Sequence, residues 1–410
     1  MRILHVSERI APMGGCERML LDTCRLLQAS GHEASILVAD DTASENAPVP
    51  VFGLPRSRGP RGARRVKPDL ESLLAKLQPD IVHLHNIQGF LSPILLTYFR
   101  KRGATVRYVH DARLFCPRYL SKLLARSGRL CSYPMGAQCL LHCYPIEAGP
   151  DTHLGILGFG FRNMELAATR RLDAIFVGSE YMREQLLVNG FHKSRLYLLP
   201  GFTDKSPDDP PGPADEPHVL AVGRFDEVKG LEELPDVLAR LQTPGWRATI
   251  VGDGPGLARA RERARELGVA ERVHFAGRVA HTELDMYYGK AAVVVVPSRI
   301  PEAFGLVGVE AMAFARPVVA HDLGGISTWL QDGVTGFLVR PGDASALAER
   351  IDALLGDRLR AERMGHEGRA RVDAHFRPRH YLRRLLEIYG AVVAARPGSS
   401  TATRGTAGCG

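Results

Sequence analysis

Short apolar runs repeat along this chain and alternate with longer amphipathic segments. The first half carries six such runs, at 2–7, 34–39, 80–86, 105–110, 174–179 and 195–200. The second half carries six more, at 218–223, 247–254, 273–277, 291–298, 317–322 and 335–340. Short apolar strands separated by helices are typical of parallel sheets covered by helices on both faces. The sequence therefore predicts an α/β protein.

One segment divides the two series of apolar runs. Residues 204–217 read DKSPDDPPGPADEP, and five prolines, five acidic residues and a glycine cannot form a core. A chain of 410 residues is also too long for one ordinary core. We therefore predict two tandem, doubly wound Rossmann-like domains that face a cleft. The N-terminal domain is predicted at 1–200, with a cysteine-containing insertion at about 112–160. A linker at 201–217 joins it to a second domain at 218–375. A helix at 376–395 is predicted to pack back on the first domain, and a disordered tail follows at 396–410.

The composition excludes several classes of protein. Apolar residues make up 45% and charged residues 24%, which is typical of a globular enzyme and not of a disordered or fibrous chain. No apolar run approaches the roughly 20 residues of a membrane-spanning helix. The N-terminal residues lack the apolar core and cleavage site of a signal peptide. We therefore expect a cytoplasmic protein.

Positive charge is concentrated in the first half of the chain. Residues 1–200 hold 26 Lys and Arg against 17 Asp and Glu, a net charge of +9. Six of these positive charges lie in 56–67, RSRGPRGARRVK, which glycine and proline predict to be a solvent-exposed loop. The alternative is a surface that binds an anionic partner, either a phospholipid membrane or a phosphate-bearing acceptor. Nucleic acid is not expected, because no recognition module accompanies the basic residues.

Four of the seven cysteines lie close together in the sequence: Cys116, Cys131, Cys139 and Cys143. Seven cysteines in a chain of this length do not indicate a secreted disulfide scaffold. The intervening stretches are looser than those of common zinc ribbons. Structural zinc is one hypothesis, and reduced, buried cysteines are the alternative.

Two loops that follow predicted strands of the second domain carry charged residues. Arg224 and Lys229 lie in GRFDEVKG, where a guanidinium and an ammonium group could clamp a diphosphate, although ordinary surface charges would look the same. In the second loop, Glu302 precedes a helix that should begin near Phe304 or Gly305. The free N–H groups at the start of that helix would bind phosphate oxygens. About two turns into the helix, Glu310 could accept hydrogen bonds from ribose hydroxyls.

The first domain offers two further candidate positions. Gly14 and Gly15 precede a predicted helix and lack side chains, so a phosphate could approach their backbone closely. His110 and Asp111 lie at the carboxyl end of a predicted strand. Because parallel sheets bind ligands at that end of their strands, we expect His110 to have a functional role.

These motifs together resemble the signature of the family-4 retaining glycosyltransferases, which have the GT-B fold. The motifs are GRFDEVKG, EAFGLVGVEAMAFARPVVA, the glycine pair 324–325, DGVTGFLVRPGD, PDIVHLHN, the N-terminal glycine loop, and HD followed by CP. The resemblance extends from residue 2 to about residue 395. Its most specific part is the pair Glu302 and Glu310, eight positions apart, combined with Arg224 and Lys229.

The resemblance implies a role for each residue on the donor side. Arg224 and Lys229 would neutralise the diphosphate of a nucleotide-sugar donor, a UDP- or GDP-sugar. The amides of Phe304, Gly305 and Leu306 would bind the same group, and Glu310 would bind the ribose. The implied reaction retains the anomeric configuration and needs neither a catalytic metal nor another cofactor.

The resemblance also implies roles around the transferred sugar and the acceptor. Glu302 would contact the transferred sugar, with His110 beside it, and Gly15 would lie near the diphosphate and the acceptor. Gly14 and Asp111 would belong to the acceptor side. The acceptor would be a saccharide or a lipid-linked saccharide at the inner membrane face, in polysaccharide or glycoconjugate biosynthesis.

Three other classes of function fit parts of the pattern. A nucleotide-sugar epimerase or a phosphorylase could share the fold, although a phosphorylase would need a cofactor lysine and a larger chain. A non-catalytic nucleotide-sugar-binding protein is less consistent with the presence of all four charged residues, Arg224, Lys229, Glu302 and Glu310. A retaining glycosidase also uses two carboxylates, but hydrolysis does not need phosphate-binding groups.

Overall fold

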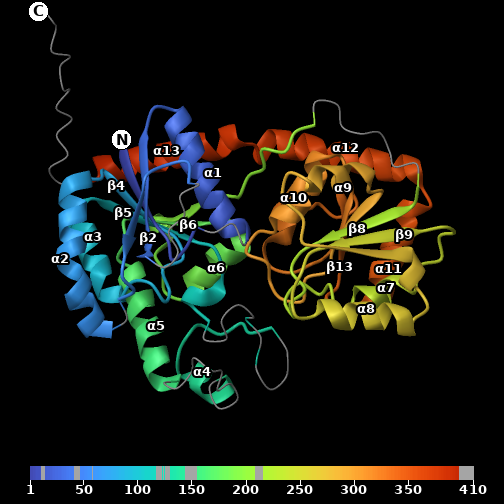
Figure 1. Ribbon diagram of the computed structural model, residues 1–410, viewed down its shortest axis with the longest axis horizontal. Helices are drawn as coiled ribbons and strands as arrows, with labels where there is room; N and C mark the ends of the chain where they lie inside the picture. Colours follow the sequence, from blue (N-terminus) through green and yellow to red (C-terminus); the bar gives the residue numbers. More distant parts are fainter. Residues whose placement is uncertain are drawn as a thin grey trace, which may run out of the picture. The chain divides into compact units, whose positions relative to one another are not determined.

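The computed structural model describes residues 1–10, 14–40, 47–57, 59–116, 122, 124, 130–143, 155–207 and 216–396 (Figure 1). The structure contains two separate sheets whose recorded strand pairings are parallel, which confirms the predicted α/β class. The predicted disordered tail lies outside the described residues, apart from its first residue. Residues 208–215, the middle of the predicted linker, also lie outside the described residues.

The first sheet has seven strands in the order β3-β2-β1-β4-β5-β6-β7. Their bounds are β1 Arg2–Val6, β2 Glu33–Ala39, β3 Val51–Leu54, β4 Ile81–Leu84, β5 Ala104–Val109, β6 Ala174–Val177 and β7 Leu196–Leu198. Strands β4, β5 and β6 are buried at every position, as expected for strands covered on both faces. The strand order reverses direction between β1 and β4, which is the switch point of a doubly wound sheet. Strand β3, at the edge, was not predicted.

Seven helices of the described chain accompany this first series. They are α1 Gly15–Ala29, α2 Gly59–Leu77, α3 Leu96–Arg102, α4 Ala137–His142, α5 Gly155–Thr169, α6 Glu180–Val188 and the C-terminal α13 Pro378–Ala394. Helix α1 begins at Gly15, one of the two glycines that were expected to precede it. Its buried residues are Met19, Leu20, Thr23, Cys24 and Leu27.

The predicted loop at 56–67 is wrong, because most of it forms the start of helix α2. Pro60 is the second residue of this helix, where a missing N–H removes no helical hydrogen bond. The helix is amphipathic and buries Ala63, Val66, Leu70 and Leu74. Arg61, Arg64 and Arg65 are exposed on it, so the positive charge remains at the surface. Arg58 lies outside the described residues.

The second sheet has six parallel strands in the order β10-β9-β8-β11-β12-β13. Their bounds are β8 His218–Val222, β9 Arg247–Val251, β10 Val273–Gly277, β11 Val293–Val296, β12 Val318–His321 and β13 Gly336–Val339. All six were predicted. The order reverses between β8 and β11, so this sheet is also doubly wound.

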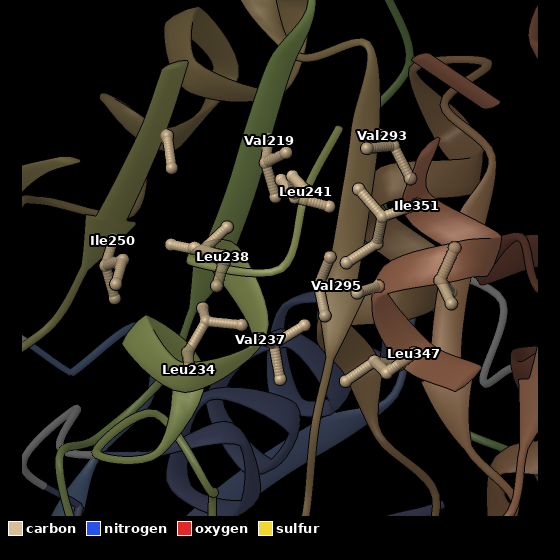
Figure 2. Packing of buried hydrophobic residues seen from close by; sticks show 14 of the residues in the cluster. Val219, Leu234, Val237, Leu238, Leu241, Ile250, Val293, Val295, Leu347 and Ile351 are labelled. Atoms are coloured by element: carbon tan, nitrogen blue, oxygen red, sulfur yellow. The ribbon is translucent and has the colours of Figure 1, made fainter. Parts of the chain in front are cut away.

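Alternate residues of these strands enter two different hydrophobic cores. Val293 and Val295 of β11 belong to one core, with residues of α7 (Leu234–Leu238), α8 (Leu257–Glu266) and α11 (Ala344–Leu355). Figure 2 shows part of this core, with Leu238 and Ile351 among its labelled side chains. Val294 and Val296 enter the opposite core, with α9 (Leu284–Lys290), α10 (Leu306–Ala313) and α12 (Arg358–His375). A strand covered on both faces must be apolar throughout, which explains the run of four valines.

Internal contacts divide the chain into two compact units. The first comprises Met1–Tyr108, Ala167–Ile175 and the chain from Leu382 onward, and the second comprises Val109–Leu166 and Phe176–Tyr381. Within the first unit, Tyr389 of α13 hydrogen-bonds His83 of β4. The predicted domain boundaries stay a prediction. Among the described helices, none combines the length and apolar character needed to cross a membrane.

Candidate functional site

The loops that follow β8 and β11 lie side by side in the second unit. Because these two parallel strands pair directly, both loops leave the sheet at the same edge. The N–H of Arg299 donates to the carbonyl of Val228 at 2.9 Å, which joins the loops. A Cβ on Gly230, whose φ is +69°, would lie 2.1 Å from the carbonyl oxygen of Pro297. This close approach therefore requires glycine at position 230.

The contact between these loops brings Lys229 to Glu302. Lys229 Nζ lies 2.6 Å from Glu302 Oε1, and the hydroxyl of Ser298 donates to the same oxygen at 2.6 Å. Burial alone would raise the pKa of the Glu302 carboxyl. Four interactions outweigh burial and lower this pKa: the charge and the hydrogen bond of Lys229, the Ser298 hydrogen bond and the charge of Arg224. Glu302 is therefore ionised at neutral pH. Sequence reasoning did not identify Ser298.

Asp226 orients both cations of the loop that follows β8. Its carboxylate pairs with Arg224 Nη2 at 2.9 Å and accepts the backbone N–H of Lys229 at 3.2 Å. The Arg224 side chain is 57% exposed, so its guanidinium is accessible to an anionic ligand. Asp226 was not singled out from the sequence. Its signal was an acidic residue three positions before Lys229, inside the same short loop.

Helix α10 begins at Leu306, close to the predicted start. Gly305 caps it in a left-handed conformation, with φ +91° and ψ +66°, so glycine relieves backbone strain here. The buried Trp329 donates its indole N–H to the carbonyl of Phe304 at 2.6 Å and packs under Gly308. Trp329 therefore fixes the first turn of the helix, whose N–H groups have no acceptor within the helix itself.

Glu310 is the fifth residue of α10, little more than one turn from its start and not the predicted two turns. Its side chain is largely buried, at 9% exposure. Its Oε1 is 2.8 Å from Nε2 of His281, and its Oε2 accepts the hydroxyl of Tyr288 at 2.9 Å. These two partners fix the orientation of the carboxylate. Neither was identified from the sequence, because they lie 29 and 22 residues away and only the fold brings them to Glu310.

The remaining predicted residues lie at the ends of elements of the first series. Gly14 is the N-cap of α1, and Gly15 is its first residue; both are exposed. His110 directly follows β5 and is buried. The Asp111 carboxylate accepts hydrogen bonds from the backbone and side chain of Arg113, so it is held locally. The structure therefore unites Arg224, Lys229 and Glu302 around one pair of loops, and the roles of all predicted residues stay predictions.

Whether the four cysteines of the predicted insertion bind zinc stays a prediction. Cys116, Cys139 and Cys143 are buried, and Cys131 is partly buried. In the part of the chain that the structure describes, one group of three potential metal ligands has its ligand atoms within 4.8 Å of one another, and it consists of His5, His83 and His85. The cysteines are not brought to such spacing.

Two Rossmann-like parts, with cations and acidic residues in the loops after the strands of the second sheet, define a protein of the GT-B class. A family model described as "Glycosyltransferase Family 4" matches residues 13–206, and one described as "Glycosyl transferases group 1" matches residues 202–371. The chain belongs to the family-4 glycosyltransferases, a family of enzymes, as the sequence predicted.

Characterised relatives match the chain over a little more than half of its length. A D-inositol 3-phosphate glycosyltransferase of Nocardia farcinica is 38% identical over 236 residues, which are 54% of this chain and 48% of the relative. A GDP-mannose-dependent alpha-(1-6)-phosphatidylinositol monomannoside mannosyltransferase of Mycobacterium tuberculosis is 32% identical over 250 residues, which are 55% of this chain and 65% of the relative. The chain thus spans about half to two thirds of the length of these relatives.

Solved structures of similar fold extend over nearly the whole chain. Sucrose-phosphate synthase from Thermosynechococcus elongatus is 25% identical, with a TM-score of 0.73 over 96% of this chain and 99% of its own. HepE from Anabaena in complex with UDP is 21% identical, with a TM-score of 0.73 over 95% of this chain and 100% of its own. These similarities support the GT-B fold.

Proposed function

We propose that this chain is a retaining glycosyltransferase that transfers a sugar from a UDP- or GDP-sugar to a saccharide or lipid-linked saccharide. The observation that carries the proposal is the cluster formed by Lys229, Glu302 and Arg224 at the edge of the second sheet. It places two cations and an ionised carboxylate within two adjacent loops. Such a set matches a donor that carries both a diphosphate and a sugar.

The diphosphate is the group that the cations would stabilise. When the bond between the anomeric carbon and the phosphate oxygen breaks, negative charge develops on the leaving diphosphate. Arg224 and Lys229, with the N–H groups at the start of α10, supply positive charge and hydrogen bonds for that oxygen. We therefore propose that the reaction needs no divalent metal ion.

The acceptor oxygen would attack the same face of the sugar from which the diphosphate departs. The new bond forms between that oxygen and the anomeric carbon, and the acceptor proton passes to the leaving phosphate oxygen. No protein group is then required as a base. Glu302 would position the transferred sugar, and His110 would lie beside it. The anomeric configuration of the product, read by NMR, tests this step; an inverted product contradicts the retaining mechanism.

Glu310 would hold the ribose of the donor. Its two oxygens are oriented by His281 and Tyr288 before any donor binds. A carboxylate has about four lone-pair positions, so it can still accept hydrogen bonds from the two ribose hydroxyls. The backbone of Gly14 and Gly15 and the side chain of Asp111 remain candidates for the acceptor side.

Two observations support the proposed partners. The HepE structure was solved with UDP, and the mannosyltransferase relative is named as GDP-mannose-dependent, so uridine and guanosine donors are the first to test. Helix α2 exposes Arg61, Arg64 and Arg65 on the surface of the first unit. We propose that these residues bind an anionic membrane surface and that the enzyme acts there in glycoconjugate or polysaccharide biosynthesis.

Thermal unfolding with nucleotides tests the donor site. A ligand at 100 times its Kd stabilises the folded state by about 2.7 kcal/mol. We expect UDP or GDP to raise Tm and ADP to have a smaller effect. In Arg224→Ala and Lys229→Ala the shift should disappear, whereas Lys290→Ala, which removes an exposed charge at the end of α9, should keep it. A protein whose Tm no nucleotide changes would rule out the proposed donor site.

A product assay separates transfer from the alternative reaction. An epimerase on this fold would change the sugar of the donor without any acceptor. We expect the donor to stay unchanged, apart from slow hydrolysis, until a saccharide acceptor is added. Formation of an epimer in the absence of acceptor would favour the alternative.

A further inference from the structure

Three histidines gather in the first unit, whereas the loops that carry the proposed donor site belong to the second. His5 of β1 and His83 of β4 are direct partners in the parallel register of these strands. His85 lies two residues further on, and its N–H continues the ladder by donating to the carbonyl of Val6 at 2.8 Å. Residues two apart on a strand share a face, so all three imidazoles point to the same side of the sheet. All three are buried.

The three rings are in mutual contact. Their centroids are 5.1 Å apart for His5 and His83, 5.3 Å for His5 and His85, and 4.4 Å for His83 and His85. One nitrogen of each ring lies within 4.8 Å of the corresponding nitrogens of the other two. Two of the rings are also joined directly, since His5 Nδ1 is 3.0 Å from His85 Nε2.

In the described part of the chain, Nε2 of His5 has no hydrogen-bond partner. This atom is fully buried, on a residue of 0% exposure. A neutral imidazole has one ring nitrogen that donates and one that accepts, so a ring nitrogen without a proton offers a lone pair to a metal ion. A buried imidazole nitrogen without a partner is costly unless something binds it.

Tyr389 of α13 is a hydrogen-bond partner for the ring nitrogen of His83 that would not bind the metal. Its hydroxyl oxygen is 2.6 Å from His83 Nδ1, and Tyr389 is itself fully buried. Histidines that bind a metal usually donate their other ring N–H to a neighbouring acceptor, which fixes the tautomer. If His83 donates its Nδ1–H to this oxygen, its Nε2 is left as the metal-binding atom.

We propose that His5, His83 and His85 form a binding site for a zinc ion, which Tyr389 orients through His83. Neutral imidazoles favour zinc and similar transition metals over magnesium or calcium. Zn–N bonds of about 2.0–2.1 Å place the ligand nitrogens of a tetrahedral site roughly 3.4 Å apart. The three rings must therefore move slightly closer together, and the hydrogen bond between His5 and His85 must break. The ion links β1, β4 and α13, and its role is structural.

The proposed metal site shares no residue with the proposed donor site. Its residues belong to the first unit, whereas Arg224, Lys229 and Glu302 belong to the second. The proposed metal independence concerns the donor loops and is unaffected by an ion at the histidines. Loss of metal binding and loss of nucleotide binding can therefore be measured separately in the same preparation.

Titration of the chelator-treated full chain with Co²⁺ and Zn²⁺ tests the proposal. Co²⁺ reports its ligands through visible absorption, and calorimetry with Zn²⁺ gives the stoichiometry. We expect one equivalent to bind, with a tetrahedral Co²⁺ spectrum that lacks thiolate charge-transfer bands, and Zn²⁺ to raise Tm. The absence of saturable binding overturns the proposal. Thiolate bands would also overturn it, because they would place the ion on the cysteines.

Variants assign the binding to these histidines. His5→Asn should lose at least 100-fold in affinity, whereas His321→Asn, at a buried histidine of β12, should keep it. Tyr389→Phe keeps all three ligands and should weaken binding about 10-fold. Should His5→Asn fail to fold, as judged by circular dichroism, the Tyr389 variant decides. Unchanged affinity in either folded variant contradicts the proposed ligand set or the proposed orientation.

Discussion

The pair formed by Lys229 and Glu302 allows stability and catalysis to be separated in one experiment. Replacement of Lys229 by Met removes the cation but keeps much of the aliphatic stem. The Glu302 carboxylate is then left with the Ser298 hydrogen bond in a site where its side chain is only 13% exposed. Breaking a fully buried ion pair costs about 3–5 kcal/mol. Because Lys229 is 32% exposed and solvent screens it, we expect a loss of about 1–2 kcal/mol.

The same substitution should lower turnover much more than it lowers stability. Loss of one preorganised group that stabilises developing charge reduces kcat by about 10²–10³. We expect this loss in Lys229→Met, measured by sugar transfer at saturating donor, with unfolding followed by circular dichroism. Lys290→Met removes an equal charge from an exposed position and should behave as the parent protein.

A second substitution distinguishes the two roles of Lys229. Glu302→Gln in the Lys229→Met background replaces the buried, unpaired charge by a neutral amide of the same shape. We expect the double variant to regain most of the lost stability while its turnover stays low, because the cation for the diphosphate is still missing and the carboxylate that would position the sugar is also gone. Recovery of turnover to within tenfold of the parent would refute the diphosphate role and show that Lys229 only neutralises Glu302.

The pH dependence of stability has a defined sign. The folded-state pKa of Glu302 is lowered, so its stabilising effect is present above the ordinary Glu pKa, near 4.3, and is lost as pH falls through the lowered value. In Lys229→Met the burial of Glu302 is opposed only by the Ser298 hydrogen bond and the charge of Arg224, so the folded-state pKa should be higher than in the parent and acid should destabilise the variant less. The stability difference between parent and variant should therefore shrink on acidification from pH 7. A constant difference would contradict the assigned ionisation.

Three further substitutions test other parts of the structure. Tyr288→Phe removes one hydrogen bond to the Glu310 carboxylate, worth about 1.5–3 kcal/mol of stability, and leaves the carboxylate less well oriented, so UDP or GDP affinity by calorimetry should fall; an unchanged affinity separates Glu310 from the nucleotide. Gly308→Ala places a Cβ 2.0 Å from the ring of Trp329, so we expect about 1–3 kcal/mol or more of destabilisation in urea unfolding, and a near-neutral result would show that α10 can shift. Arg64→Glu should weaken sedimentation with anionic vesicles at low salt, and equal binding would remove α2 from the proposed membrane surface.

The strands were predictable because burial on both faces leaves a simple signal. The valines of β11 are apolar at four successive positions, and each enters one of two cores. The loops that bear Lys229 and Glu302 were predictable for a related reason, since functional side chains gather where parallel strands end. Their direct contact was not, because it requires the pairing of β8 with β11, and sequence alone does not give the strand order.

Helix α2 shows how a local signal misled the sequence reasoning. Gly59 and Pro60 are breakers inside a helix but are tolerated in its first turn, and the prediction treated them as loop residues. Pro68 lies inside the same helix, which continues through it to Leu77. The buried face formed by Ala63, Val66 and Leu70 was the competing signal, and it prevailed because burial stabilises a helix more than propensity does.

The partners of the acidic residues could not be found from sequence for a different reason. His281 and Tyr288 reach Glu310 from 29 and 22 residues away, and such contacts exist only after α9 and α10 have packed on the same face of the sheet. Neither residue has a pattern of its own in the sequence. Their effect is to hold a carboxylate in one orientation, which a motif of two glutamates cannot express.

The charges of the donor site are already balanced before any donor binds. Asp226 pairs with Arg224, and Glu302 pairs with Lys229, so the diphosphate must compete with two carboxylates for the same cations. An ammonium group has three N–H donors and a guanidinium has five, so each can keep its carboxylate and still bind a phosphate oxygen. The acidic partners therefore hold the cations in place and keep the empty site stable. This dual use is the reason that Lys229→Met alone should lower both stability and turnover, whereas its combination with Glu302→Gln should restore stability and leave turnover low.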